Sequence, residues 1–296
     1  MESSSRQVFG GEGARLLCWP GRNLGLLVLL LCLTATFCFA QRGWGRRRQP
    51  RNLDDYRQYN NIPKWENPKG FEHDTFTFAR VQYQSGWRGR GSGDWATDYP
   101  DSDLNFSLRL QQLTSIKVNP DPVIVKLDDE NLGDYPFLYM IEPGGIELFQ
   151  AEVDGLRKYC LNGGFMMVDD FWSDREYEVF FREIKRVFPD RPVEELPLEH
   201  EIFHNVYDLD EKPQIPSIGW AYDGNTWEVR KGPSARDVHY RAIKDDDDRI
   251  MVLICHNTDL GDGWEREGEN REYFEKFSVK KAYPMGINIV TYAMTH

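Results

Sequence analysis

Cysteine is scarce in this 296-residue chain. Of its five cysteines, Cys18, Cys32 and Cys38 lie in the first 40 residues, which leaves only Cys160 and Cys255 for the remainder. The sequence contains no CxxC pair and no other spacing typical of zinc ligands, which excludes the common cysteine-based zinc sites. Because both remaining cysteines occur in apolar segments, we expect buried free thiols rather than a disulfide.

Positive charge is also in short supply. The chain has 36 Lys and Arg against 48 Asp and Glu, and its formal net charge at pH 7 is −12. The first 40 residues hold three Arg and two Glu, so the acidic excess lies entirely in the rest of the chain. A strongly acidic body disfavours nucleic acid as the main partner.

Residues 24–40 form an uncharged apolar run that follows three arginines. The run is short for a membrane-spanning helix and ends in Cys38-Phe39-Ala40, with small residues at the positions that a signal peptidase reads. We therefore expect residues 1–40 to be a signal or membrane-anchor segment, and the protein to be exported or membrane-anchored and extracytoplasmic. Five arginines between residues 42 and 51 resist translocation, so an anchor with a cytoplasmic-facing domain stays open.

The rest of the chain divides into a linker and one domain. Residues 41–72 are rich in Arg, Gln, Asn and Pro and show no period, which predicts a basic, largely disordered linker. Residues 73–296 are enough for one α/β domain with a sizeable core.

The domain is organised around a strand–helix–strand unit. The apolar run 137–141 stops at Pro143, as expected for a strand that is buried on both faces. Apolar residues then recur at helical spacing over 147–161, and two glycines end that helix. A second apolar run, 165–168, completes a βαβ unit with parallel strands and a right-handed crossover.

Other segments repeat this alternation of strand and helix. Strands are predicted at 75–83, 122–127 and 249–256, helices at 103–116 and 285–295, and an inserted β-hairpin extension within 213–245. Because the apolar runs are continuous rather than alternating, the predicted fold is a doubly wound, mostly parallel sheet in a three-layer α/β sandwich.

The loops that follow the predicted strands contain the candidate site, because ligands of open α/β sheets bind beyond the carboxyl ends of the strands. The candidate ligand-binding residues there are Arg88, Trp95, Glu142, Gly144, Gly145, Asp169, Asp170, Trp172, His256 and Asp259. Asp98 and Asp262 lie in the same loops. We expect these groups to share one edge of the sheet. The sequence identifies no catalytic residue and no cofactor.

The carboxylates among these residues have two interpretations. Asp169 or Asp170, together with His256, could hold a divalent cation or act as acid and base. Adjacent residues at a strand end usually point in opposite directions, so one of the two aspartates is equally a helix cap or an ion-pair partner. Trp95 and Trp172 could stack against a flat ligand such as a sugar, or could simply pack the loops.

Two further motifs favour structural interpretations. The GRGSG loop at 89–93 could cradle a phosphate, but no Walker lysine follows it, which favours an ordinary flexible loop. His200 and His204 stand at i and i+4 but not in an HExxH motif, and we expect them to be structural.

Several segments resemble the bacterial domain-of-unknown-function family 4159 over residues 73–296: FTFARVQY, WATDYPDSD, DYPFLYMIEPGG, LRKYCLNGGFMMVDDFW, FREIKRVFPDR, LPLEHEIFH and NTDLGDGWE. The resemblance implies a flavodoxin-like sandwich similar to class I glutamine amidotransferases, often behind an N-terminal export or membrane segment. It implies no activity.

The sequence departs from the amidotransferase pattern at the position of the nucleophile. Those enzymes carry a cysteine on a sharp strand-to-helix elbow beside an oxyanion hole. Here the corresponding strand end reads MMVDDFW, and neither G-x-C-x-G nor G-x-S-x-G occurs anywhere in the chain. We therefore do not expect cysteine-dependent amide transfer.

Three functional hypotheses remain. The first is a non-catalytic cell-envelope module that binds a small ligand or an envelope protein at the strand-end edge, with membrane association through residues 24–40. The alternative is a metal-assisted hydrolase that uses strand-end Asp and His residues. The third is an interaction subunit that uses residues 213–245 as its contact surface.

Overall fold

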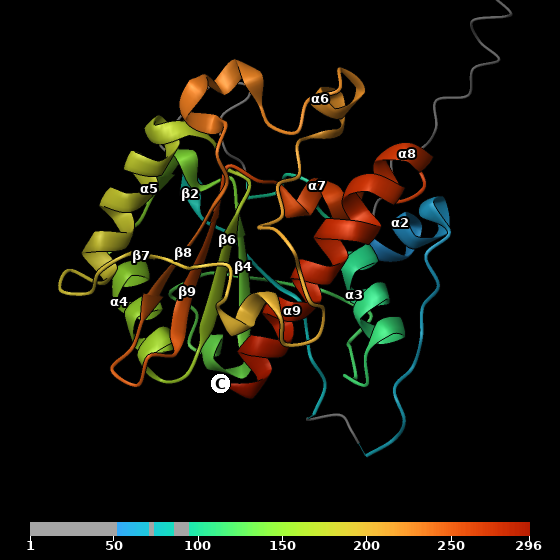
Figure 1. Cartoon of the computed structure of the whole chain (residues 1–296). Helices are drawn as coiled ribbons and strands as arrows, with labels where there is room; N and C mark the ends of the chain where they lie inside the picture. Colours follow the sequence, from blue (N-terminus) through green and yellow to red (C-terminus); the bar gives the residue numbers. More distant parts are fainter. Residues whose placement is uncertain (1–51, 71–73, 86–94) are drawn as a thin grey trace, which may run out of the picture. The chain divides into compact units, whose positions relative to one another are not determined.

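A seven-stranded sheet lies at the centre of the computed structural model, which describes residues 52–70, 74–85 and 95–296 (Figure 1). The sheet has the order β3-β1-β4-β6-β9-β8-β7. Its strands are β1 (Ala79–Val81), β3 (Val123–Val125), β4 (Phe137–Ile141), β6 (Phe165–Asp169), β7 (Glu194–Glu195), β8 (His239–Lys244) and β9 (Ile250–His256). A separate antiparallel ribbon pairs β2 (Gln84–Ser85) with β5 (Ile146–Glu147).

The strand directions confirm the predicted doubly wound, mostly parallel sheet. The strands from β3 to β9 in this order are parallel, and β8 and β7 extend one edge through antiparallel pairings. The chain moves from β1 to β3 in one direction along the sheet, and from β4 through β6 to β9 in the other. The order therefore reverses between β1 and β4, which is where doubly wound folds open a crevice.

Helices cover both faces of the sheet and complete the three-layer sandwich. Figure 1 shows α4 and α5 on one side of the sheet and α3, α7 and α9 on the other. The α-helices are α2 (Leu53–Asn60), α3 (Asp101–Leu113), α4 (Gln150–Leu161), α5 (Ser173–Val187), α6 (Ile218–Tyr222), α7 (Leu260–Glu265), α8 (Arg271–Tyr273) and α9 (Tyr283–Thr295), and a π-helical segment, Phe274–Ala282, joins the last two. Short 3₁₀ turns are η1 (Leu132–Asp134), η2 (Pro143–Gly145), η3 (Glu201–Phe203), η4 (Val229–Lys231) and η5 (Pro233–Ala235).

The core consists of two layers that the sheet separates. In β4, Phe137 and Tyr139 belong to the layer under α3 and α9, whereas Leu138 and Met140 belong to the layer under α4 and α5. Both layers are buried, and every residue of β4 is apolar or aromatic on either side of the sheet. This burial explains the continuous apolar runs in the sequence.

Part of the predicted linker packs on the domain. Arg57, on α2, is 4% exposed and forms an ion pair with Asp121 at 2.7 Å. The indole Nε1 of Trp65 donates to the carbonyl of Val118 at 2.8 Å. Residues 52–70 therefore lie against the loop that precedes β3, while the predicted segment 1–40 lies outside the described residues. Within the ranges described, no helix is both long and apolar enough to cross a membrane.

The predicted extension within 213–245 is only partly β structure. Its last residues form β8, which pairs with β9 and β7, whereas α6, η4 and η5 occupy the earlier part. Side chains replace strand partners here: Asn257 donates to the carbonyls of Ser234 and Asp237 at 2.9 and 2.7 Å. The backbone of this part is thereby held without a neighbouring strand.

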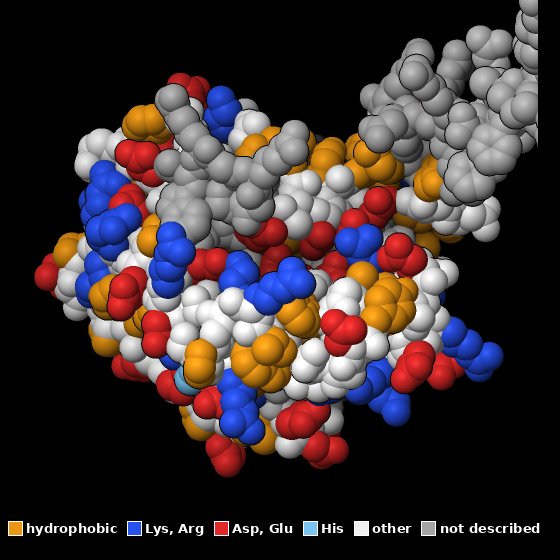
Figure 2. All heavy atoms as spheres, turned by 90° about the horizontal axis from the view of Figure 1, so that it is seen from above, with side chains coloured by type: hydrophobic (Ala, Val, Ile, Leu, Met, Phe, Trp, Pro, Cys, Tyr) orange, Lys and Arg blue, Asp and Glu red, His pale blue; other side chains and the backbone are white. Residues whose placement is uncertain are grey.

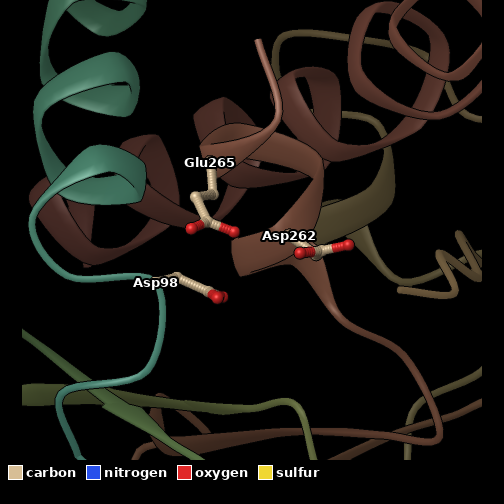
Figure 3. Close-up of side chains that lie close together, drawn as sticks. All are labelled: Asp98, Asp262 and Glu265. Atoms are coloured by element: carbon tan, nitrogen blue, oxygen red, sulfur yellow. The ribbon is translucent and has the colours of Figure 1, made fainter. Parts of the chain in front are cut away.

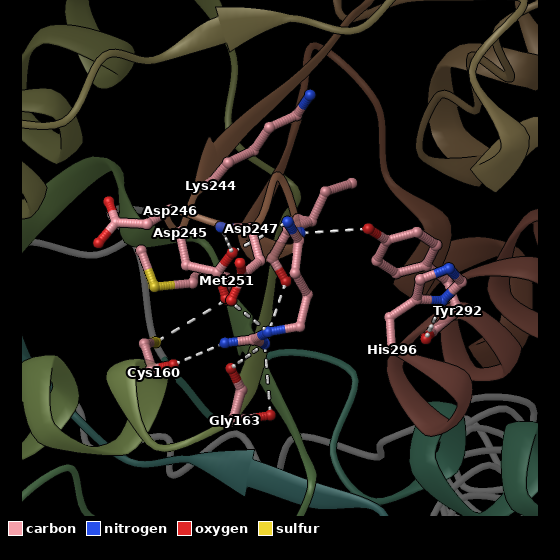
Figure 4. A network of polar contacts seen from close by, with 12 residues as sticks. Cys160, Gly163, Lys244, Asp245, Asp246, Asp247, Met251, Tyr292 and His296 are labelled. Atoms are coloured by element: carbon pink, nitrogen blue, oxygen red, sulfur yellow. Dashed lines mark hydrogen bonds and ion pairs between the residues drawn. The ribbon is translucent and has the colours of Figure 1, made fainter.

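Arg249 fixes the turn between β8 and β9, which lies at the amino ends of the parallel strands. Figure 4 shows the polar contacts around this turn. The Nε of Arg249 donates to Asp245 at 2.8 Å, and its guanidinium donates to the carbonyls of Cys160 at 2.8 Å and Gly163 at 3.3 Å. The turn is thus tied to the end of α4. Cys160 and Cys255 are both buried and free, as the sequence predicts.

Candidate functional site

A cavity of about 290 Å³ opens at the carboxyl ends of the strands. Its walls come from the loops after β1, β4, β6 and β9, from the first turn of α5, and from the segment that runs from Ser217 to Lys231 through α6 and η4. The lining residues are Thr97, Asp98, Glu142, Gly144, Asp170, Trp172, Glu176, Ser217, Glu228, Lys231, Asp259, Asp262 and Arg266. Figure 2 looks down on this face and shows acidic side chains gathered near its centre.

The charge of the cavity is strongly one-sided. Seven of its lining residues carry a carboxyl group, and only Lys231 and Arg266 carry a positive charge. Lys231 pairs with Glu176 at 2.5 Å, and the Nε of Arg266 pairs with Asp262 at 2.9 Å. The seven carboxyl groups therefore share two cations within the lining.

Asp98 reaches the cavity through a loop that Arg80 fixes. Arg80, on β1, is fully buried, donates from Nε to Asp103 at 2.9 Å, and donates from Nη1 to the carbonyls of Trp95 at 3.0 Å and Thr97 at 2.9 Å. Asp98 follows directly with φ of 60°, a left-handed conformation that is uncommon outside glycine. This loop therefore has little freedom to move Asp98 away.

The electrostatic state of Asp98 differs from that of an exposed carboxyl group. Its Oδ2 atom is closed off from solvent and has no hydrogen-bond partner. Burial, followed by the charges of Asp262 and Glu265, raises the pKa of Asp98 well above its usual range. A positive charge placed here would favour the ionised carboxylate.

The ends of β4 and β6 lie level because Ile141 pairs with Asp169. The next residue on each strand, Glu142 and Asp170, takes a left-handed conformation with φ of 49° and 52°. The indole Nε1 of Trp172 donates to Asp170 Oδ1 at 2.9 Å. Burial, then the charge of Glu142, raises the pKa of Asp170 well above its usual range. Strained conformations of this kind concentrate at functional sites.

Helix α7 supplies the remaining acidic wall. Asp259 caps the helix, because its Oδ1 accepts from the backbone N–H of Asp262 at 2.6 Å. Burial, then the charges of Asp170 and Asp262, raises the pKa of Asp259 well above its usual range. One turn along, outside the cavity lining, burial raises the pKa of Glu265 to about 7.

Asp169 and His256 lie outside the cavity lining and point to opposite faces of the sheet. Asp169 Oδ2 accepts from the N–H groups of Leu260 and Gly261, at 2.9 and 3.1 Å, on the α7 side. The ring of His256 packs against Phe171 on the α5 side, and burial lowers its pKa to about 3. The structure therefore does not bring these two metal candidates together.

The other candidates from the sequence have varied positions. Gly144 lines the cavity so close to α5 that an added Cβ would lie 2.6 Å from Cγ of Glu176, and Gly145 is buried beside it in η2. Trp95 packs against Tyr99 with ring centroids 6.3 Å apart. Arg88 lies outside the described residues.

His200 and His204 do not form a metal pair. His200 Nδ1 accepts from the N–H of Ile202 at 3.2 Å, while His204 bonds Asp208 at 2.5 Å. Both histidines serve local structure, as the sequence predicts.

The sequence candidates omit six members of the cavity wall: Thr97, Glu176, Ser217, Glu228, Lys231 and Arg266. Ser217, Glu228 and Lys231 belong to the segment from the start of α6 to the end of η4, which crosses the strand ends, and no motif in the sequence marks that path. Glu176 lies in the first turn of α5, where its carboxylate accepts from the backbone N–H of Trp172 at 2.7 Å.

The family model for a domain of unknown function, DUF4159, matches residues 77–294 of this chain. The match covers most of the chain, which therefore belongs to this family. A comparison with the curated proteins finds no match.

Proposed function

We propose that this member of a family without an assigned activity is a binding module, and that its strand-end cavity takes up a small ligand that carries positive charge. The observation that supports the proposal is the cavity wall, where seven carboxyl groups face two cations. The volume, about 290 Å³, suits a small ligand rather than a protein segment.

The electrostatic argument concerns the cost of keeping these carboxyl groups together. Burial and mutual repulsion raise the pKa values of Asp98, Asp170 and Asp259, so each ionised group is destabilised in the folded protein. A bound cation offsets both the cost of burial and the mutual repulsion, because an opposite charge within about 4–6 Å favours ionised carboxylates.

A thermal-shift titration of the full chain in detergent tests this proposal. The probes are putrescine, spermidine and glucosamine, with glucose as an uncharged comparison. We expect at least one amine to raise Tm, and Asp170→Asn to abolish that increase. Asp246→Asn is the matched control, because Asp246 is exposed in the turn at the far end of the sheet. Equal responses of both variants, or a response to glucose alone, would count against the proposal.

A metal-assisted hydrolase is the second candidate function. It is favoured by the pKa of Glu265, about 7, which suits an acid–base group at neutral pH. Because Asp169 and His256 face opposite sides of the sheet, a hydrolase would need metal ligands from the cavity wall instead. Hydrolysis of p-nitrophenyl esters or phosphates that depends on added Mn²⁺ and disappears in Glu265→Gln would support it, and no turnover with or without metal would remove it.

We also propose that residues 24–40 export the protein or anchor it in a membrane, and that the fold is related to that of glutamine amidotransferases. The apolar run behind three arginines supports the first proposal, and the reversed strand order of the parallel sheet supports the second. Determining the N-terminus of the mature protein tests the role of residues 24–40. A start near residue 41 indicates cleavage of an export signal. An intact chain that stays soluble contradicts both export with cleavage and membrane anchoring.

A further inference from the structure

Three carboxyl groups meet at the edge of the cavity where the loop before α3 faces α7 (Figure 3). One carboxylate oxygen from each of Asp98, Asp262 and Glu265 lies within 4.8 Å of the other two. Asp262 and Glu265 stand at i and i+3 on α7, so they project from the same side of the helix. Asp98 comes from the loop before α3 and completes the cluster from the opposite wall.

The scaffold holds the two walls in register. The side-chain amide of Asn105, on α3, donates to the carbonyl of Trp264, on α7, at 2.9 Å. The backbone carbonyl of Asp98 accepts from the N–H of Ser102 at 3.0 Å, in the first turn of α3. The positions of all three carboxyl groups therefore depend on one packed pair of helices.

A second observation singles out this cluster from an ordinary acidic surface. Asp98 Oδ2 is closed off from solvent and has no hydrogen-bond partner among the described residues, although an unpaired buried carboxylate oxygen is costly. The space it occupies exists because residue 261 is glycine: an added Cβ there would lie 2.8 Å from Oδ2. The fold thus admits an oxygen atom whose bonding capacity is unused.

The charge balance indicates the valence of the missing partner. Arg266 contacts two members of the cluster, with its Nε 2.9 Å from Asp262 and 2.8 Å from Glu265. One guanidinium against three carboxylates leaves a formal excess of two negative charges. A divalent cation neutralises that excess, whereas a single monovalent amine neutralises half of it.

We propose that Asp98, Asp262 and Glu265 bind one divalent cation of the hard, oxygen-preferring class, Mg²⁺, Mn²⁺ or Ca²⁺. All three donors are oxygen atoms, with no imidazole or thiolate among them, which disfavours zinc. Asp98 and Asp262 also line the cavity, so the remaining coordination positions face it and are open to water or to a ligand. This inference rests on the proposed function, since it names a cation as one occupant of the same cavity.

Direct binding of Mn²⁺ tests the inference. The full chain in detergent is treated with EDTA, freed of chelator and titrated with MnCl₂, and free Mn²⁺ is followed by electron paramagnetic resonance. We expect one Mn²⁺ per chain, and competition by CaCl₂ or MgCl₂. Glu265→Gln and Asp98→Asn each keep the side-chain shape and should weaken the affinity at least tenfold. Asp246→Asn should bind as the wild type does.

The outcomes separate this inference from the proposed function. No saturable Mn²⁺ binding at millimolar concentration, or equal binding by all three variants, overturns the cation site, provided that circular dichroism shows each variant folded. An amine response that Asp170→Asn abolishes would then still support the cavity as a ligand site. Conversely, Mn²⁺ binding that depends on Glu265, without any amine response, would support the cation site and contradict the amine ligand.

Discussion

Asp169 links the end of β6 to the start of α7 through one carboxylate oxygen. Its Oδ2 accepts from two N–H groups at the start of α7 and from the hydroxyl of Tyr139 at 3.1 Å, while its Oδ1 has no partner. Burial outweighs these hydrogen bonds and raises its pKa to about 7. The residue therefore anchors α7 beneath the cavity, and its protonation is coupled to the stability of the fold.

This coupling predicts a pH dependence at a single residue. Between its unfolded pKa of about 3.9 and its folded pKa of about 7, the unfolded chain releases a proton that the folded protein keeps. The contribution of Asp169 to stability therefore falls as the pH rises through this window, by about 2–3 kcal/mol between pH 5 and 8. Asp169→Asn removes this term, so its free energy of unfolding should fall less over that range in urea titrations. An identical fall in both proteins would contradict the assignment, and Asp246→Asn serves as the exposed control.

Helix α4 shows how one glycine permits a close contact between elements. A Cβ on Gly155 would lie 2.0 Å from the carbonyl oxygen of Leu127, just beyond β3, and a backbone atom cannot turn aside. Alanine is intrinsically better than glycine in a helix by about 1 kcal/mol. The close approach nevertheless favours glycine here, because the helix must lie against the chain at this point.

The two effects can be separated with paired glycine substitutions. We expect Gly155→Ala to lower the free energy of unfolding by about 1–3 kcal/mol, since the overpacked helix must shift away from Leu127. Gly219→Ala, on α6, meets no atom within 4 Å and should be neutral or stabilising by up to about 1 kcal/mol. Thermal unfolding of both variants measures these changes in stability. A more stable Gly155→Ala variant would show that α4 has room for a methyl group beside Leu127.

An element can be predicted from sequence when its burial produces a recognisable pattern of apolar residues. β4, β6 and β9 are buried at every position, so their apolar runs stand out and are predicted within a residue or two. β2 and β5 have two residues each, too few for any period, and only contacts from distant parts of the chain create them. The sequence predicts a β-hairpin within 213–245, but α6, η4 and η5 occupy residues 218–235. Hydrogen bonds from distant side chains such as Asn257 hold this backbone, and such bonds produce no recognisable pattern in the sequence.

The same distinction applies to the cavity wall. The strand-end rule located Glu142, Asp170, Trp172 and Asp259 at the cavity, because it depends only on where strands stop. The rule also selected Asp169, whose side chain points into the core because successive side chains along a strand alternate between the two faces of the sheet. The rule could not locate Lys231, whose position depends on the path of a segment without regular period.

At the scale of the whole molecule, the described domain begins earlier than the family match, which starts at residue 77. Residues 52–70 cover the loop before β3 with α2, Ile62 and Trp65, and Ile62 is 7% exposed. The described residues, 52–70 among them, belong to one compact unit. Stability should therefore depend on residues that precede the family region.

Truncation tests this dependence. A chain that begins at residue 73 loses the Arg57–Asp121 ion pair and the packing of Trp65, whereas a chain that begins at residue 50 keeps both. We expect the shorter chain to have a lower free energy of unfolding by about 2–4 kcal/mol, the range for losing one large packed side chain and a partly buried pair. Equal urea midpoints for the two chains would show that α2 contributes nothing.

The cavity is assembled from residues between Thr97 and Arg266, so its two walls are synthesised far apart in time. Until β9 and α7 have left the ribosome, Asp98, Glu142 and Asp170 have no opposite wall and remain hydrated. Docking of β9 and α7 removes water from these side chains and brings Asp259 and Asp262 next to them, so the electrostatic cost of the cavity is complete only in the finished chain.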